Sequence, residues 1–174
     1  MNMLDTILAR RSVRQYTDET IPEEKLNAIL YAGLAAASSK NRRSWEFVVV
    51  RDRNMLNRLC DCRPGAEKLL GGCHAAIVVT ADAELVDVWV EDCASAITQM
   101  HLLADALGVG SCWLQVRLRK AADGRDTADV VRDALGIPER YGVMAILALG
   151  MPADHPAPRT VEDLPLEKIH HERF

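Results

Sequence analysis

The segment from Leu85 to Leu107 constrains the fold of this chain more than any other. Its apolar residues recur every three or four positions, the spacing that puts side chains on one face of an α-helix. They are Val86, Trp89, Cys93, Ile97, Met100, Ala104 and Leu107. Further apolar residues fall on other sides, so we expect a helix that is buried centrally or shared with a partner subunit. Glu91, Asp92 and Asp105 interrupt it too often for a membrane helix, and no run of about 18 apolar residues occurs anywhere in the chain.

Four strand candidates and several shorter helices surround this segment. The strands, rich in β-branched and aromatic residues, are predicted at 45–50, 75–80, 111–116 and 143–149. Shorter helices are predicted from Leu4 into Arg10, after a capping box at Thr20–Glu23, and over 54–59, 64–70 and 126–135. A length of 174 residues suits one domain, 1–174, and the interleaved elements predict an α+β fold with a mixed β-sheet flanked by helices.

The last stretch, 153–174, lacks this regularity. Pro156, Pro158 and Pro165 break it, and charged residues dominate. It nevertheless ends in apolar residues, including Ile169 and Phe174. An arm without a globular body gains little by packing locally, so its expected acceptor is another subunit.

The overall charge excludes some classes of partner. The chain has 21 Lys and Arg against 25 Asp and Glu, a net charge of −4, whereas nucleic-acid and membrane binders are normally basic. Asp5 and Arg10 interrupt the N-terminus, which therefore lacks a secretion signal, and we expect a cytoplasmic protein. Its five cysteines, an odd number, are then expected to be reduced. Cys60 and Cys62 stand one residue apart, unlike the two-residue spacing of a zinc knuckle, so no metal site is predicted.

The segment Arg10–Arg14 is the most informative short motif. It contains three arginines and Ser12 at the predicted end of the first helix. Guanidinium groups bind phosphate oxygens through paired hydrogen bonds, and a hydroxyl can add another. The alternative is a solvated basic helix end, which the helix dipole favours. Spacing alone does not decide between these two interpretations.

A second basic region lies between Ser38 and Arg63, with seven basic residues against three acidic ones. This local surplus in an acidic chain favours an anionic small molecule. Ser38–Asn41 begins it as a polar loop that could bind hydroxyls or a heterocycle edge, although Ser and Asn are also ordinary turn residues. No catalytic acid, base or nucleophile is identified, as expected where a bound cofactor does the chemistry.

Taken together, these motifs resemble the nitroreductase family of FMN-dependent oxidoreductases, in particular its short single-domain members. The resemblance covers almost the whole chain in six ordered segments. They are Arg10–Tyr16, Ala36–Trp45, Glu91–Trp113, Leu135–Pro138, Ala148–Pro152 and His170–Phe174.

The resemblance implies a homodimer with two FMN sites at the subunit interface and a domain-swapped C-terminal arm that crosses to the partner. By this likeness Arg10, Arg11, Ser12 and Arg14 hold the phosphate, ribityl chain and pyrimidine edge of FMN. Ser38, Ser39, Asn41 and Arg43 reach the flavin from the other subunit. Trp113, Leu114 and Gln115 line the flavin ring, with a backbone N–H bonded to its N5, and Arg159 closes on the phosphate.

The implied reaction is a ping-pong transfer of two electrons from NAD(P)H, through flavin N5, to a nitroaromatic, quinone or similar small acceptor. The chain departs from the family pattern at Ala37, Arg43 and Ser44, where the family has proline and a Gln-Pro pair, and at Ala157, where it often has lysine. These departures motivate an alternative, a flavin-binding carrier or sensor without turnover of its own.

Overall fold

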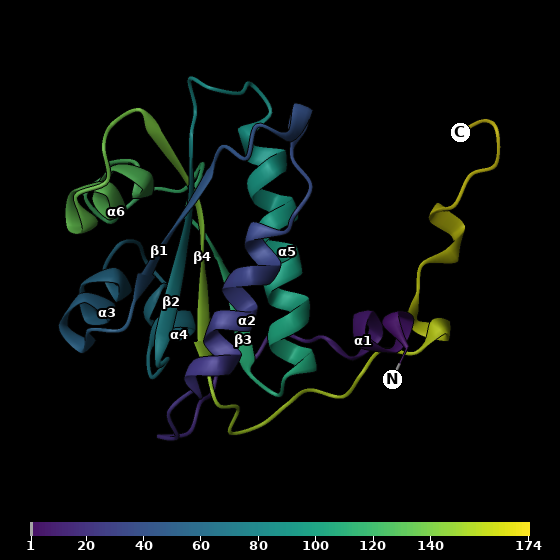
Figure 1. The fold of residues 1–174 in the computed structure, drawn as a ribbon. Coiled ribbons are helices and arrows are strands. Elements are labelled where there is room, and N and C mark those ends of the chain that lie inside the picture. Colours follow the sequence, from purple (N-terminus) through teal and green to yellow (C-terminus); the bar gives the residue numbers. More distant parts are fainter. Residues whose placement is uncertain (1) are drawn as a thin grey trace.

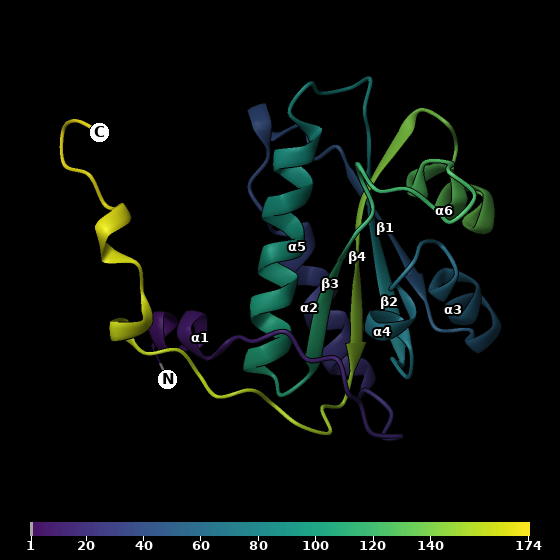
Figure 2. The same ribbon diagram turned by 180° about the vertical axis from the view of Figure 1, so that it is seen from behind.

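A computed structural model describes residues 2–174, and Figure 1 shows three layers. The elements are α1 (Met3–Ala9), α2 (Glu23–Leu34), η1 (Ser39–Asn41), β1 (Trp45–Val50), α3 (Arg53–Cys60), α4 (Glu67–Leu70), β2 (Ala75–Asp82), α5 (Trp89–Ala106), β3 (Gly110–Gln115), α6 (Thr127–Leu135), β4 (Tyr141–Gly150), η2 (Val161–Asp163) and η3 (Leu166–Lys168). The four strands form the middle layer, with α2 and α5 on one face and α3, α4 and α6 on the other (Figures 1 and 2). The predicted α+β fold is confirmed.

The sheet has the order β1-β2-β4-β3, and all three pairings described within residues 2–174 are antiparallel. The expected mixture of parallel and antiparallel strands is therefore wrong for the single chain. That expectation came from helices interleaved with uniformly apolar strands, a pattern usual for parallel sheets. Here the helices cover an antiparallel sheet on both faces, which gives β2 and β4 the same buried, apolar sequence.

Each face of the sheet has its own apolar core. Under α2 and α5 the core includes Ile29, Ile77, Ile97, Met100 and Leu147. The second core, beneath α3, α4 and α6, contains leucine or valine side chains from each of these helices. It also contains the strand side chains that point away from α2 and α5. Because side chains alternate along a strand, the two cores divide β3 and β4 residue by residue.

The observed helices correct two predictions. α5 begins at Trp89 rather than Leu85, because the chain between Ala83 and Val88 forms turns rather than helix. α2 begins at Glu23 with Pro22 as its N-cap and no capping side chain, so the predicted capping box at Thr20 is wrong. The strand over 45–50 is confirmed with the predicted bounds.

The N-terminal helix α1 and the segment 153–174 lie on the outer side of α5, away from the sheet (Figures 1 and 2). Arg159 N–H donates to the Leu8 carbonyl at 3.0 Å, which joins the two segments. Beyond it Val161, Leu166, Ile169 and Phe174 are exposed. Among the described residues, none of the helices has the length and apolar content needed to cross a membrane.

Candidate functional site

The arginine segment after α1 is fixed against strand β3 by its backbone. Val13 N–H donates to the Ser111 carbonyl at 2.9 Å, and the Val13 side chain is only 1% exposed. Tyr16 Oη donates to the Val13 carbonyl at 2.9 Å. A glycine at position 110 permits this close approach, because a Cβ there would lie 2.8 Å from Val13 Cγ1. The residues on either side of Val13 are thereby held at the edge of the sheet.

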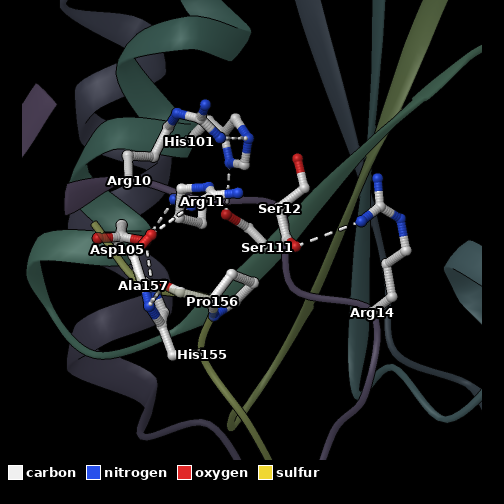
Figure 3. Close-up of polar contacts among 10 residues, drawn as sticks. All are labelled: Arg10, Arg11, Ser12, Arg14, His101, Asp105, Ser111, His155, Pro156 and Ala157. Atoms are coloured by element: carbon white, nitrogen blue, oxygen red, sulfur yellow. Dashed lines mark hydrogen bonds and ion pairs between the residues drawn. The ribbon is translucent and has the colours of Figure 1, made fainter. Parts of the chain in front are cut away.

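Two residues of α5 receive this segment, as Figure 3 shows. Arg10 Nη1 lies 2.8 Å from His101 Nε2, and His101 Nδ1 lies 2.5 Å from Ser111 Oγ. One turn later, Asp105 Oδ1 accepts from Arg11 N–H at 3.2 Å and from His155 Nε2 at 2.8 Å. Arg11 Nη1 donates to the Ala157 carbonyl. The sheet, the long helix and the start of the arm therefore meet around this segment.

Burial and charge determine the ionisation of the groups at this junction. Burial and the nearby charge of Arg159 lower the pKa of Arg10 from its ordinary value, although the guanidinium remains protonated. Burial, and then the charge of Arg10, lower the pKa of His101 to about 4. The junction therefore carries positive charge on its arginines and a neutral imidazole near pH 7.

A cavity of about 570 Å³ opens beside this junction. Its lining includes four of the predicted site residues, Arg10, Ser12, Trp113 and Arg159, together with Ile7, Thr98, His101 and Leu102. Arg14 lies on the far side of Ser12, exposed, with Nη1 3.4 Å from the Ser12 carbonyl (Figure 3). The cavity thus combines two guanidinium groups, a hydroxyl and an indole ring, a suitable set for an anionic group attached to an aromatic ring system.

Strand β3 is an edge strand and exposes part of its backbone next to this cavity. The carbonyls of Ser111 and Gln115 accept from Val13 N–H and Arg63 Nε, which lie outside the sheet. In an antiparallel edge strand, alternate residues direct both backbone groups outward. The N–H groups of Trp113 and Gln115 therefore point away from β4.

Of the three residues predicted to line the ring, Leu114 offers only its backbone. Its side chain is fully buried in the core under α3, α4 and α6, on the opposite face from Trp113. The Trp113 indole N–H donates to Gln115 Oε1 at 3.0 Å, which joins the two neighbouring outward-facing residues.

The predicted residues Ser38, Ser39, Asn41 and Arg43 lie elsewhere, at the N-terminal end of α5. Ser39 N–H donates to Asp92 Oδ1 at 2.8 Å, and Arg43 N–H donates to Ser38 Oγ at 3.0 Å. Asp92 and Asp105 are thirteen residues apart on α5, a separation of about 20 Å along the helix axis. Within one chain the structure does not bring this loop and the arginine segment together.

Backbone conformation distinguishes this loop from an ordinary turn. Lys40, Asn41 and Arg43 all have positive φ values, 50°, 54° and 51°. Such strain in residues other than glycine is often stored where a segment must present groups to a ligand. Arg43 Nε donates to Asn41 Oδ1 at 3.0 Å, so these two predicted residues support each other.

Four residues at the site lie outside the predicted set: His101, Asp105, Ser111 and Arg63. His101 and Asp105 lie four positions apart and share one face of the long helix, a spacing visible in the sequence. Nothing local indicates Arg63 or Ser111, whose partners are distant in the chain.

No cluster of three or more His, Cys, Asp or Glu within residues 2–174 is placed to hold a metal ion. Burial raises the pKa of Cys62 to about 11 and that of Cys73 to about 12, so both thiols are protonated near pH 7.

Comparison with known proteins places these features in context. The model of the nitroreductase family matches residues 7–63 and 58–151. A protein of Archaeoglobus fulgidus, provisionally named as an NADH dehydrogenase/NAD(P)H nitroreductase, is 37% identical over 98% of both chains.

Solved structures agree with this match. An FMN-dependent nitroreductase of Clostridium difficile R20291 superposes with a TM-score of 0.95 and 39% identity, covering 99% of this chain and 100% of the other. A protein of Desulfovibrio desulfuricans, provisionally named a nitroreductase and solved in complex with FMN, gives a TM-score of 0.80 and 28% identity over 100% and 99% of the two chains.

Proposed function

The chain belongs to the nitroreductase family, and we propose that it is an FMN-dependent oxidoreductase that moves two electrons from NAD(P)H to a small organic acceptor. When bound, FMN supplies the centre that accepts and then donates the hydride. NAD(P)H and the acceptor use the same cleft in turn, in ping-pong order, and the acceptor is a nitroaromatic, a quinone or a similar compound. The chain itself binds, orients and shields the reacting groups.

The observation that carries this proposal is the position of Arg10 and Arg159 at one cavity beside the edge of β3. Burial, and then the charge of Arg159, lower the pKa of Arg10, and an anion between the two guanidinium groups relieves their mutual repulsion. A phosphate ester accepts hydrogen bonds from both guanidinium groups and from the Ser12 hydroxyl. The residues present therefore fit the phosphate end of FMN.

The edge of β3 suits the ring end of the cofactor. The outward N–H groups of Trp113 and Gln115 offer hydrogen bonds to a heterocycle, and the Trp113 side chain lines the same cavity. Since Leu114 directs its side chain into the core, its part in the site is limited to spacing Trp113 and Gln115. Positive charge from Arg14 beside this edge would stabilise negative charge on a reduced ring.

The distance between the loop and the arginine segment supports a site shared by two subunits. Ser38, Ser39, Asn41 and Arg43 are about 20 Å from the arginine segment along α5, so they serve the cavity of a partner rather than their own. In this arrangement the protein is a homodimer, residues 1–174 form one FMN-binding domain, and 153–174 cross to the partner. We place it in the cytoplasm, where its five free cysteines remain reduced.

The direct test is FMN binding by an Arg10→Ala variant, followed by fluorescence titration. Each charge-assisted contact to phosphate contributes about 1.5–3 kcal/mol, so we expect affinity to fall by roughly tenfold or more. Arg159→Ala, at an exposed position, should weaken binding without affecting folding. Arg51→Ala, which removes an exposed arginine paired with Glu23 far from the cavity, is the matched control. Unchanged affinity in both site variants would contradict the proposed site.

Reduction of the bound flavin by NAD(P)H distinguishes an oxidoreductase from the alternative, a flavin carrier or sensor. The wild-type protein loaded with FMN is mixed anaerobically with NADH or NADPH while absorbance is recorded. Bleaching of the flavin band within seconds supports an oxidoreductase, whereas persistent colour with both donors supports a carrier or sensor.

A further inference from the structure

We propose that His101 is a positioning residue: a neutral imidazole on α5 that holds the Arg10 guanidinium in the cavity without cancelling its charge. The inference rests on the proposed function only for the identity of the anion that Arg10 receives. Its basis is the hydrogen-bonded chain Arg10–His101–Ser111, which joins the arginine segment, the long helix and β3 (Figure 3).

The chemistry of the partners fixes the tautomer of His101. Arginine has donors and no acceptor, so His101 Nε2, 2.8 Å from Arg10 Nη1, must be the unprotonated nitrogen. The proton is then on Nδ1, which donates to Ser111 Oγ at 2.5 Å. Ser111 is 1% exposed and His101 is 6% exposed, so water cannot readily replace either bond.

The charged groups around the imidazole favour the same state. Arg10 faces Nε2 directly, and Arg159 lies beyond it at the cavity. Asp105, one turn along the same helix, favours the protonated imidazole, but it already accepts from Arg11 N–H and His155. Burial and Arg10 outweigh it, and the pKa of His101 is lowered to about 4.

A neutral acceptor has a specific advantage at this position. A carboxylate in place of His101 would also orient Arg10, but it would neutralise the guanidinium and compete with an incoming anion. The imidazole fixes the direction of Arg10 and leaves its full charge to the ligand. Fixing a long side chain before binding lowers the entropy that the complex must lose.

Two variants separate positioning from general packing. In His101→Gln the side-chain carbonyl can take the place of Nε2 and still accept from Arg10. In His101→Asn the shorter amide stays beside Ser111 and cannot reach Arg10. We expect FMN affinity to remain within about threefold of wild type in His101→Gln and to fall roughly tenfold in His101→Asn, the scale of one charge-assisted hydrogen bond.

The phosphate provides the control. Riboflavin lacks the group that Arg10 receives, so its affinity should be equal in wild type and His101→Asn. In an Arg10→Ala background, His101→Asn should have no further effect on FMN binding, because the residue it orients is absent. If His101 had only a structural role, His101→Asn would lower the affinity for both FMN and riboflavin. Its effect on FMN affinity would then add to that of Arg10→Ala.

A measurement without flavin tests the geometry itself. The ¹⁵N NMR resonances of His101 in the ligand-free protein at pH 7 should show an unprotonated Nε2 and a protonated Nδ1. A protonated Nε2, or FMN affinity in His101→Asn equal to that of wild type, would overturn the inference. If wild type does not bind FMN, the proposed function fails, and the NMR result still decides the state of His101.

Discussion

The two ends of α5 present the predicted binding residues in opposite ways. Near its C-terminal end, His101 and Asp105 hold the arginine segment through two polar contacts, to Arg10 and to Arg11 N–H. A backbone hydrogen bond from Val13 N–H fixes the same segment to β3. Near its N-terminal end, Asp92 holds the loop 38–43 through Ser39 N–H, while its other carboxylate oxygen is buried without a partner in the part of the chain described.

In the proposed dimer this difference gives the two halves of each site different tasks. The arginine end would receive the anion within its own chain, since its backbone and side chains are already fixed. The loop end combines a strained backbone with the exposed side chains of Asn41 and Arg43. Such a segment gains contacts only when another molecule lies over it, which is the role expected at a two-fold interface.

The largest expected effect comes from damaging the two ends in different chains. Arg10→Ala with Arg14→Ala removes the arginine half, and Asn41→Ala with Arg43→Ala removes the loop half. If each site takes its halves from two subunits, a heterodimer of these variants has one intact site and one doubly damaged site. We expect roughly one tightly bound FMN per heterodimer, against two in wild type and none in either variant homodimer.

Co-expression with two different affinity tags isolates the heterodimer, and released FMN is measured by absorbance against protein concentration. A heterodimer that binds no FMN would show that both halves act within one chain. That result would contradict the assignment of the two ends of α5 to different sites, because the loop and the arginine segment would then serve a single cavity despite their separation on α5.

The second effect concerns the buried histidine, which only the arginine end contains. Because the pKa of His101 is lowered from 6.5 to about 4 in the folded state, the unfolded chain binds more protons between these values. The free energy of unfolding should therefore rise as pH rises from about 4 to about 6.5, by about 3 kcal/mol from this residue, and then stay constant.

Urea unfolding of wild type and His101→Gln across this pH range isolates that contribution, since all other groups titrate in both proteins. The His101→Gln curve should be flatter between these pH values by about the same 3 kcal/mol. Ser38→Ala, at the loop end, should keep the wild-type slope. Parallel curves for wild type and His101→Gln would show that His101 is protonated in the folded state as readily as in the unfolded one.

Local patterns in the sequence predicted most of the fold. The strand over Trp45–Val50 has the expected bounds because β-branched residues and flanking polar residues define both ends. The predicted start of α5 is four residues too early because Leu85 and Val86 continue the apolar spacing while the chain still turns. Whether two strands pair parallel or antiparallel depends on how the chain connects them, and the local spacing of apolar residues does not determine this.

Two of the predicted site residues, Arg10 and Ser12, stand close together in the sequence, and both line one cavity with Arg159, which only the family resemblance had indicated. Their contacts with FMN stay a prediction. The contact between His101 and Arg10 could not be predicted because the two residues are 91 positions apart; the sequence shows only that His101 shares a helix face with Asp105. The burial of the Leu114 side chain could be predicted: if Trp113 faces a ligand, strand alternation places the side chain of its neighbour on the other face.

The smallest of these effects tests how rigidly the arginine end is docked, through Gly110→Ala. The new Cβ would lie 2.8 Å from Val13 Cγ1 and 3.2 Å from the Gly150 carbonyl, so Val13 must move outward. Overpacking of this kind costs about 1–3 kcal/mol of stability. FMN affinity should fall as well, because Arg10, Ser12 and Arg14 shift with the backbone of Val13. Adding Val13→Ala removes the closest contact and should restore part of both losses, measured by thermal unfolding and FMN titration. If the double variant had the same stability and FMN affinity as Gly110→Ala alone, the position of the arginine segment would not depend on this contact. The two ends of α5 would then differ less in rigidity than their hydrogen bonds indicate.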